Sequence, residues 1–260
     1  MGHSPMTTRK KDWFREWFNE DYRLVYRHRK HEDSRKEVAF VSRTLGLSRE
    51  ARILDLCCGA ARHLIPLWEA GHGNLVGLDL SAILLGAAQR AMKRAGASAR
   101  LVRGDMLHLP FVEKSFDYVL SFFSSFGYFE TDEENTSVLS EMIRVLKPGG
   151  ILWLDAMNPD YVLGNLEPET QRREGGWEIR EERRYVPEGK RIEKTVAIRK
   201  EGENRTYRES VRLYDLSELE AIIAKVGARV ASVFGDYAEI PSGPETPRLI
   251  VVSRKGETTD

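Results

Sequence analysis

Three acidic residues, each associated with a short apolar segment, have the types and spacing that could do chemistry. Asp55 precedes a turn of small residues, Asp79 ends the next apolar segment, and Asp105 ends a third. A carboxylate at the carboxyl end of a strand can accept hydrogen bonds from both hydroxyl groups of a ribose. The small residues after Asp55 let a ligand approach the backbone, and a helix that follows offers free N–H groups. We therefore expect a ribose-containing ligand across these segment ends.

Two classes of cofactor fit such a site, and the residues favour one of them. A dinucleotide needs a close glycine-rich approach for its pyrophosphate, but Cys57 and Ala61 flank Gly59 where a three-glycine fingerprint has its other two glycines. S-adenosylmethionine carries ribose and adenine but no phosphate. In Asp105-Met106, a carboxylate can accept the adenine amino group and a thioether can pack on the purine face. This favours S-adenosylmethionine and leaves a dinucleotide-dependent oxidoreductase as an alternative.

The elements that must position these residues alternate between strand and helix. Helical patterns separate the apolar segments, and the last helix is expected to stop at the strong breaker Lys147-Pro148-Gly149-Gly150. Such alternation predicts a parallel sheet that is covered on both faces, with ligands over the carboxyl ends of its strands. The expected strands are 52–57, 75–79, 101–105, 116–121 and 151–155, and the expected helices are 62–71, 82–95 and 133–146.

The flanking regions have different patterns. Aromatic residues at steps of four predict one helix over 12–30, and a second helix is expected over 34–46. The charge-dense stretch 172–213 predicts an antiparallel insert with one exposed face. Its expected strands are 176–186, 191–200 and 204–213, and a helix over 215–226 and strands over 228–234 and 248–254 follow. We therefore divide the chain into an N-terminal helical segment (1–46), a core (47–160), the insert (161–213) and the completion of the core (214–260).

Taken together, the motifs resemble those of the class I S-adenosylmethionine-dependent methyltransferases. The resemblance implies an α/β fold with a doubly wound, seven-stranded, mostly parallel Rossmann-like sheet, N-terminal helices and an antiparallel insert after the fifth strand. The departures are Cys57 and Ala61, where many members of the family have glycine. The matching segments occur in the family's order and are 54–63, 76–81, 104–106, 116–119 and 144–150.

The resemblance also implies roles for particular residues. An arginine at a helix start can pair with a carboxylate, so Arg62 is expected to face the carboxylate of the cofactor. The other implied contacts are Asp55, Cys57, Gly59 and Ala61 along the methionine part, Asp79 on the ribose, Leu80, Asp105 and Met106 at the adenine, and Ser121 and Phe122 near the methyl group.

The methyl acceptor is expected to contact a different set of residues. The aromatic N-terminal helix either packs in the core or forms a lid over the pocket, and in the second case Tyr22, Tyr26 and Arg29 would reach the acceptor. Ser125 and Tyr128 follow the fourth strand, where acceptors dock in this fold. Asn158 completes the set. It begins Asn158-Pro159-Asp160-Tyr161, which resembles a tetrapeptide of nucleic-acid amino-methyltransferases but follows the fifth strand rather than the fourth, so coincidence is favoured.

Other reactive residue types are expected to be structural. Cys57 and Cys58 are the only two cysteines, so they cannot complete a zinc site and are expected to be small turn residues. His63 lies within an expected helix, where a packed or surface histidine is favoured over a catalytic base. We therefore assign no metal site and no catalytic residue.

The overall charge limits the substrates. The chain has 40 Lys plus Arg and 40 Asp plus Glu, which argues against a dedicated polyanion binder. Residues 1–36 nevertheless carry 10 basic and 6 acidic side chains, so an RNA or protein methyltransferase stays an alternative, as does a non-catalytic cofactor-binding module. The sequence predicts transfer to an oxygen or nitrogen of a small molecule by a monomer or homodimer. With no apolar run long enough to span a membrane and no apolar stretch of a secretory signal at the N-terminus, a cytoplasmic location is expected.

Overall fold

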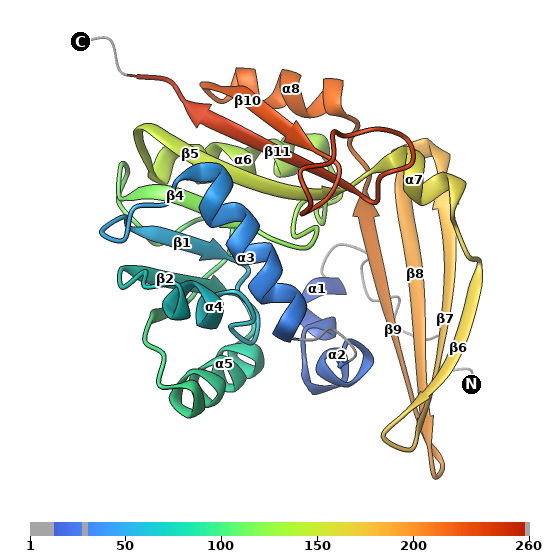
Figure 1. Cartoon of the computed structure of the whole chain (residues 1–260). Coiled ribbons are helices and arrows are strands. Elements are labelled where there is room, and N and C mark those ends of the chain that lie inside the picture. Colours follow the sequence, from blue (N-terminus) through green and yellow to red (C-terminus); the bar gives the residue numbers. More distant parts are fainter. Residues whose placement is uncertain (1–12, 28–30, 258–260) are drawn as a thin grey trace, which may run out of the picture.

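The computed structural model describes residues 13–27 and 31–257, and it contains two separate β-sheets. The larger sheet has seven strands in the order β10-β11-β5-β4-β1-β2-β3 (Figure 1). β11 runs antiparallel to both of its neighbours, and the pairs among β1 to β5 are parallel. The expected fold class is therefore confirmed. The strands are β1 (Ile53–Leu56), β2 (Leu75–Asp79), β3 (Arg100–Arg103), β4 (Phe116–Ser121), β5 (Leu146–Met157), β10 (Ala228–Phe234) and β11 (Arg248–Lys255).

Helices cover both faces of this sheet because its strands are apolar on both sides. Along β1, Ile53 belongs to one hydrophobic cluster while Leu54 and Leu56 belong to another. The cluster of Ile53 includes side chains of α3 (His31–Leu45), α4 (Leu64–Glu69) and α5 (Ala82–Ala95). The cluster of Leu54 includes side chains of α6 (Asp132–Val145) and α8 (Leu216–Lys225). The chain order reverses between β1 and β4, which places the switch point of the sheet at the end of β1.

Side-chain caps fix where several of these helices begin. Ser81 accepts a hydrogen bond from the backbone N–H of Leu84 at the start of α5. Thr131 and Asp215 each form a capping box with the glutamate three residues later, at the starts of α6 and α8. Each cap satisfies backbone donors that the first helical turn leaves free, so the strand-to-helix turns above the sheet are well defined.

The insert is a four-stranded antiparallel sheet, one strand more than the sequence predicted. Its strands are β6 (Glu169–Glu174), β7 (Trp177–Val186), β8 (Arg191–Lys200) and β9 (Glu203–Arg212), in that order. The sequence Glu-Thr-Gln-Arg-Arg-Glu of β6 has no apolar residue, so hydrophobic periodicity could not reveal it. Pairing with β7 defines this strand. The sheet stands beside the core, and α7 (Pro159–Gly164) leads into it from β5 (Figure 1).

The N-terminal segment corrects a second prediction. Instead of one helix over 12–30, the structure has α1 (Trp13–Trp17) and α2 (Glu20–Val25). The side chain of Asn19 accepts hydrogen bonds from the N–H groups of Asp21 and Tyr22, so it caps α2 and interrupts the helix. Both helices lie between the core and the insert sheet (Figure 1). There, Trp17 and Val25 pack against buried side chains of the insert, which are Ile179, Val196 and Ile198.

Smaller differences concern the ends of elements. The helix expected over 62–71 is the shorter α4, and the expected breaker at Lys147–Gly150 lies inside β5, which begins directly where α6 ends. β3 ends at Arg103, so Asp105 lies in the loop beyond the strand. Among the described residues, no helix is long and apolar enough to cross a membrane, and no group of His, Cys, Asp or Glu has the geometry of a metal site.

Candidate functional site

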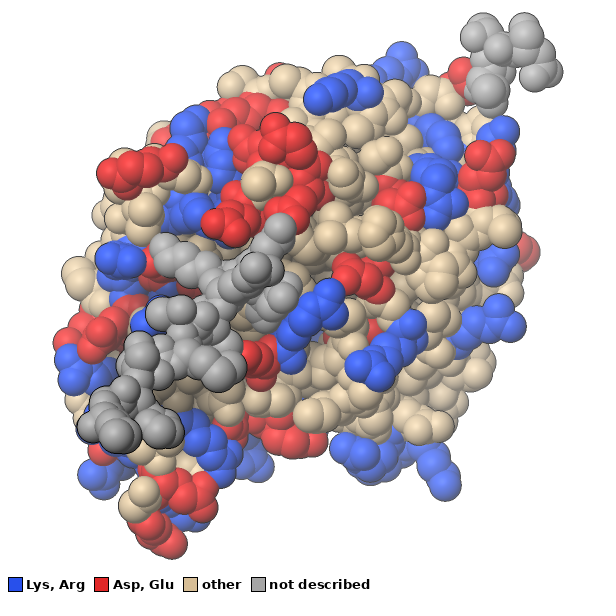
Figure 2. Space-filling view, turned by 180° about the vertical axis from the view of Figure 1, so that it is seen from behind, with Lys and Arg blue, Asp and Glu red and all other residues tan. Residues whose placement is uncertain are grey.

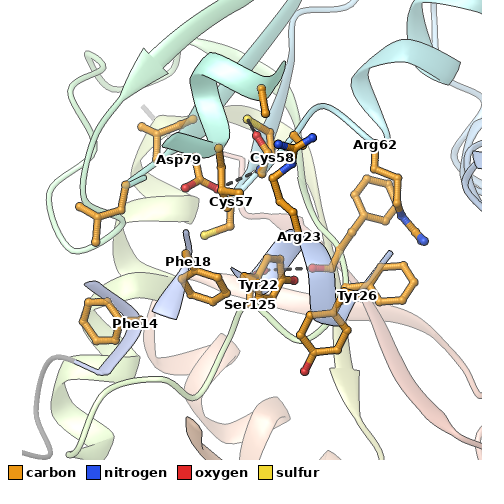
Figure 3. A pocket seen from close by; sticks show the side chains of 18 of the residues that line it. Phe14, Phe18, Tyr22, Arg23, Tyr26, Cys57, Cys58, Arg62, Asp79 and Ser125 are labelled. Atoms are coloured by element: carbon orange, nitrogen blue, oxygen red, sulfur yellow. Dashed lines mark hydrogen bonds between the residues drawn. The ribbon is translucent and has the colours of Figure 1, made fainter. Parts of the chain in front are cut away.

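Two cavities lie above the switch point of the large sheet. Pocket 1 has a volume of about 580 Å³ and is lined by the loops after β1, β2, β3 and β4 together with α1, α2 and α5. Pocket 2 has a volume of about 410 Å³ and lies between α1, α2, α7 and the insert strands. Figure 3 shows pocket 1 with Asp79, Cys57 and Cys58 on one side and the aromatic side chains of α1 and α2 on the other.

Asp79 is held rigidly at the wall of pocket 1. One carboxylate oxygen accepts the N–H of Gly59 at 2.9 Å and the other accepts the N–H of Ser81 at 2.8 Å. Burial raises the pKa of Asp79, and these backbone hydrogen bonds partly oppose that effect. Because Ser81 is the N-cap of α5, Asp79 is not needed to cap that helix. Each carboxylate oxygen keeps a lone pair with which it can accept a ligand hydroxyl.

The turn after β1 adopts a left-handed backbone at alternate residues. Cys57, Gly59 and Ala61 have φ values of 61°, 52° and 66°. This conformation suits glycine, and in Cys57 and Ala61 it is a local strain of the kind found at ligand sites. A Cβ on Gly59 would meet no heavy atom within 4 Å, so the backbone there is open to the pocket. Burial raises the pKa of both thiols, Cys57 and Cys58, well above the usual value, so both are neutral turn residues as expected.

Three of the predicted cofactor contacts lie behind the wall of pocket 1. Asp55, Ala61 and Ser121 are almost completely buried and are not among the lining residues. Asp55 points to the α3–α4 face of the sheet because it alternates with Leu54 and Leu56 along β1. Burial, and next the charge of Asp79, raises the pKa of Asp55. These three residues therefore support the wall of pocket 1 from behind rather than line it.

Arg62 and His63 form a cluster with Glu37 of α3. Arg62 Nη2 and His63 Nε2 lie 2.5 and 2.8 Å from the same oxygen, Oε2 of Glu37. Against the effect of burial, the hydrogen bond of His63 and the charge of Arg62 lower the pKa of Glu37. Burial in turn lowers the pKa of His63, whose ring stacks on Phe122 at 3.8 Å. Arg62 lines pocket 1, but its charge is already paired, which weakens its predicted role towards a cofactor carboxylate.

The loop after β4 is held by a buried acid that the sequence analysis did not single out. Asp155 of β5 accepts the N–H of Phe123 at 2.9 Å, and its carbonyl oxygen accepts the N–H of Ser124 at 2.9 Å. Both loop residues have positive φ values, 56° and 58°. Arg248 of β11 pairs with the carboxylate of Asp155, and its guanidinium lies 5.5 Å from the Phe123 ring centroid. β11 therefore stabilises the loop that separates the two pockets.

Aromatic side chains of α1 and α2 close both cavities. Phe18, Tyr22 and Tyr26 line pocket 1 and pocket 2, together with Phe123 and Tyr128 from the β4 loop. The rings contact one another, with centroid distances of 4.9 Å between Phe18 and Tyr22 and 4.7 Å between Tyr22 and Tyr26. The segment therefore packs in a core of its own and also lines both pockets, and its role as a lid stays a prediction.

The charged wall of pocket 2 comes from the insert. Lys194 of β8 forms ion pairs with Glu181 at 3.1 Å and with Glu209 at 3.2 Å. Lys194 also donates a hydrogen bond to the hydroxyl of Tyr26, which itself donates to Glu209 at 2.9 Å. Arg183 lines the same wall and pairs with Glu181. No local sequence pattern distinguishes these residues from the other charges of the insert.

The predicted site residues are therefore brought together only in part. Asn158 lines neither pocket, because its side chain caps α7 and donates to the carbonyl oxygens of Gly243 and Thr246. Arg29 lies outside the described residues. Asp105, which lines pocket 1, pairs with Arg15 of α1 at 3.0 Å. The predicted residues that do line pocket 1 are Tyr22, Tyr26, Cys57, Gly59, Arg62, Asp79, Leu80, Asp105, Met106, Phe122, Ser125 and Tyr128.

Comparison with known proteins agrees with this arrangement. Residues 53–150 match the model of a family described as a methyltransferase domain. A demethylmenaquinone methyltransferase of Geobacillus stearothermophilus is 38% identical over 130 residues, which cover 49% of this chain and 53% of that protein. The chain thus spans about half the length of the curated relatives it matches.

Two solved structures resemble the whole fold. An S-adenosylmethionine-dependent methyltransferase from Clostridium acetobutylicum has a TM-score of 0.78 at 17% identity and covers 94% of this chain and 99% of its own. The sugar N-methyltransferase KedS8 from Streptoalloteichus sp has a TM-score of 0.68 at 21% identity, with coverages of 91% and 93%. Residues 53–150 thus match a methyltransferase domain, and the two solved structures share the fold of almost the whole chain.

Proposed function

We propose that this protein transfers the methyl group of S-adenosylmethionine to a small molecule, with the cofactor in pocket 1 and the acceptor in pocket 2. The observation that carries the proposal is the shared wall of the two cavities. Phe18, Tyr22, Tyr26, Phe123 and Tyr128 line both, so ligands in the two cavities would meet at these side chains. A bisubstrate reaction needs this arrangement, because the reacting atoms must approach within bonding distance.

The residues of pocket 1 fit S-adenosylmethionine. Asp79 offers carboxylate lone pairs to the ribose hydroxyls, and the open backbone at Gly59 admits the methionine part. Met106 lies 3.8 Å from Cys57, sulfur to sulfur, and gives the adenine side an apolar surface. The cofactor supplies a methyl group that its sulfonium already activates. The protein therefore needs mainly to bind, align and exclude water.

The chain's own residues would do this in three ways. The Asp155–Arg248 pair holds the β4 loop between the pockets, so Phe123 keeps its position. The rings of α1 and α2 shield the cavities from solvent. Glu37 orients Arg62 and His63 at the methionine end. These groups position and enclose the reactants.

A small acceptor is favoured over a polymer by the size and charge of the site. Pocket 2, at about 410 Å³, is a small cavity bounded by helices and strands of this chain. On the face in Figure 2, Lys and Arg are interspersed with Asp and Glu, and the chain carries 40 basic and 40 acidic residues in total. Interspersed charges do not create the single-sign surface on which polyanion binding depends. The names of the relatives, a demethylmenaquinone and a sugar N-methyltransferase, are consistent with small acceptors.

Two measurements test the proposal. Calorimetric titration of the full chain with S-adenosylhomocysteine should show one site, and Asp79→Asn should weaken it. Incubation with S-adenosylmethionine labelled in the methyl group, together with panels of small amines, phenols and alcohols, should then give labelled product. Binding without turnover on all panels would favour a non-catalytic module, and tighter binding of a dinucleotide than of S-adenosylhomocysteine would contradict the proposal.

A further inference from the structure

We propose that Glu209 is the anchor for the acceptor and that the acceptor is an amine, which the aromatic wall of pocket 2 holds as its positive charge develops. The inference rests on the proposed function, since it specifies the occupant of the second pocket. The two oxygens of the Glu209 carboxylate differ in their hydrogen bonds, and this difference suggests the occupant.

Among the described residues, every donor to Glu209 reaches the same oxygen. Trp17 Nε1 donates to Oε1 at 2.5 Å, Tyr26 donates to it at 2.9 Å, and Lys194 Nζ lies 3.2 Å from it. No residue in the described part of the chain donates to Oε2. The side chain lines pocket 2 and is 18% exposed. Three donors thus fix the carboxylate in place and leave its second oxygen for a hydrogen-bond donor in the cavity.

The surroundings of this oxygen are suited to a cation. Pocket 2 is lined by Trp13, Phe18, Tyr22, Tyr26, Phe123, Tyr128 and Tyr161. Aromatic faces attract ammonium groups electrostatically, and aromatic cages with an adjacent carboxylate bind alkylated amines. Most of these rings form one continuous wall, with Trp13 and Tyr128 in contact at a centroid distance of 5.0 Å. An alkylammonium could therefore contact several ring faces while one N–H reaches Glu209.

The cations that line pocket 2 would not strongly repel a bound ammonium group, because each is already paired with a carboxylate. Lys194 is shared between Glu181 and Glu209, Arg183 pairs with Glu181, and Arg248 pairs with Asp155. The side chain of Lys194 is also only 11% exposed, and its ammonium group donates a hydrogen bond to the Tyr26 hydroxyl. Two carboxylates line this pocket: Glu167, which is exposed, and Glu209, whose Oε2 accepts no hydrogen bond from the described residues.

The chemistry of an amine acceptor matches the placement of this charge. The amine gives its proton to water and binds as the free base, with one N–H donated to Oε2 of Glu209. The nitrogen lone pair then forms the new N–C bond, and the C–S bond breaks with its electron pair passing to sulfur. Positive charge therefore moves from sulfur in pocket 1 to nitrogen in pocket 2, towards Glu209. A fixed carboxylate at this position stabilises the transition state more than the ground state.

Choline and dimethylbutanol test the inference without turnover. They have nearly the same shape, but a carbon atom in dimethylbutanol replaces the charged nitrogen of choline. We expect the full chain, saturated with S-adenosylhomocysteine, to bind choline about 10-fold more tightly in calorimetry. Glu209→Gln keeps an Oε1 acceptor for Trp17 and Tyr26, and it should reduce the preference to the part that the aromatic rings contribute. Glu203→Gln, on the same strand but outside both pockets, should keep it.

The outcomes separate the possible explanations. A merely structural role of Glu209 would lower the affinity for both probes equally, whereas the anchor role affects choline alone. Equal binding of both probes by the unmodified chain would indicate a neutral acceptor and overturn the inference, as would failure of choline to bind. If Glu209→Gln does not fold, Tyr161→Leu, which alters no hydrogen bond of Glu209, should still weaken choline binding. Loss of S-adenosylhomocysteine binding would instead count against the proposed function.

Discussion

Replacing Asp79 by asparagine would test the assignment of pocket 1 most directly. The two carboxylate oxygens each accept a different backbone N–H, from Gly59 at 2.9 Å and from Ser81 at 2.8 Å. Asparagine has one acceptor oxygen, so one N–H would face an NH₂ group that cannot accept it. A buried donor left unsatisfied costs about 1–3 kcal/mol, and the turn between β1 and α4 should loosen accordingly.

The effect on cofactor binding should be comparable in size to the effect on folding. Hydrogen bonds to a charged group contribute about 1.5–3 kcal/mol, so loss of the ribose contact predicts roughly 10- to 150-fold weaker binding of S-adenosylhomocysteine. The pH dependence provides a second signature. Because burial raises the pKa of Asp79, the affinity of the unmodified protein should begin to fall on acidification above the usual range of an aspartate. The affinity of Asp79→Asn should lack this component.

Asp117→Asn provides a matched control for this substitution. Asp117 also accepts a backbone N–H, from Arg52 at 2.8 Å, but it lies at the start of β4 and lines neither pocket. Calorimetry and thermal unfolding of both variants would separate folding from binding. Unchanged affinity in Asp79→Asn, or an equal loss in Asp117→Asn, would refute the assignment of Asp79 to the ribose.

Further predictions concern the contacts that hold the site together. Gly127→Ala would place a Cβ 2.4 Å from the carbonyl oxygen of Arg212 at a φ of 88°, so we expect a loss of at least about 2 kcal/mol in the free energy of unfolding. Gly149 also has a positive φ, but a Cβ there would meet no atom within 4 Å, so Gly149→Ala should lose less stability. Equal losses in the two variants would contradict the steric argument. The cations around Glu181 lower its pKa to about 2, so the stability that it contributes, about 1–3 kcal/mol after allowance for solvent screening, should be present above pH 4.5 and lost as the pH falls towards 2. Chemical unfolding should therefore show a deficit of Glu181→Gln at pH 7 that shrinks at pH 3, and a constant deficit would speak against the linkage. Asp21 accepts hydrogen bonds from Arg205 and Tyr207 and so holds α2 against β9. Because Phe18 and Tyr22 line pocket 1, Asp21→Asn should weaken S-adenosylhomocysteine binding. Asp33→Asn on α3 is the exposed control, and identical affinities of the two variants would exclude this coupling.

The last of these predictions changes how the insert should be tested. In the structure, Trp17 and Val25 pack on the insert, and the same two helices close pocket 1. Deletion of the insert should therefore weaken cofactor binding as well, and unchanged cofactor affinity would show that α1 and α2 hold their position without it.

The sequence by itself determined the core fold and much of pocket 1. Most β-strands of the core are apolar runs followed closely by a turn. The order of these strands along the chain and the strand ends near Leu56, Asp79 and Ser121 could therefore be derived from local patterns. The residues nearest a ligand in such a fold lie within a few positions of a strand end. This is why Gly59, Asp79 and Met106 were predicted and do line the pocket.

Only the tertiary structure decided pocket 2 and the supports of the site. Glu37 meets Arg62 across 25 residues of chain, and Glu209 meets Tyr26 across 183. Such pairs have no local signature, because a glutamate in a charge-dense strand has the same sequence pattern whether it faces solvent or a cavity. The break at Asn19 and the strand β6 likewise depend on a side-chain cap and on pairing with a neighbour. Local periodicity defines elements, whereas the contacts between distant elements place the charges.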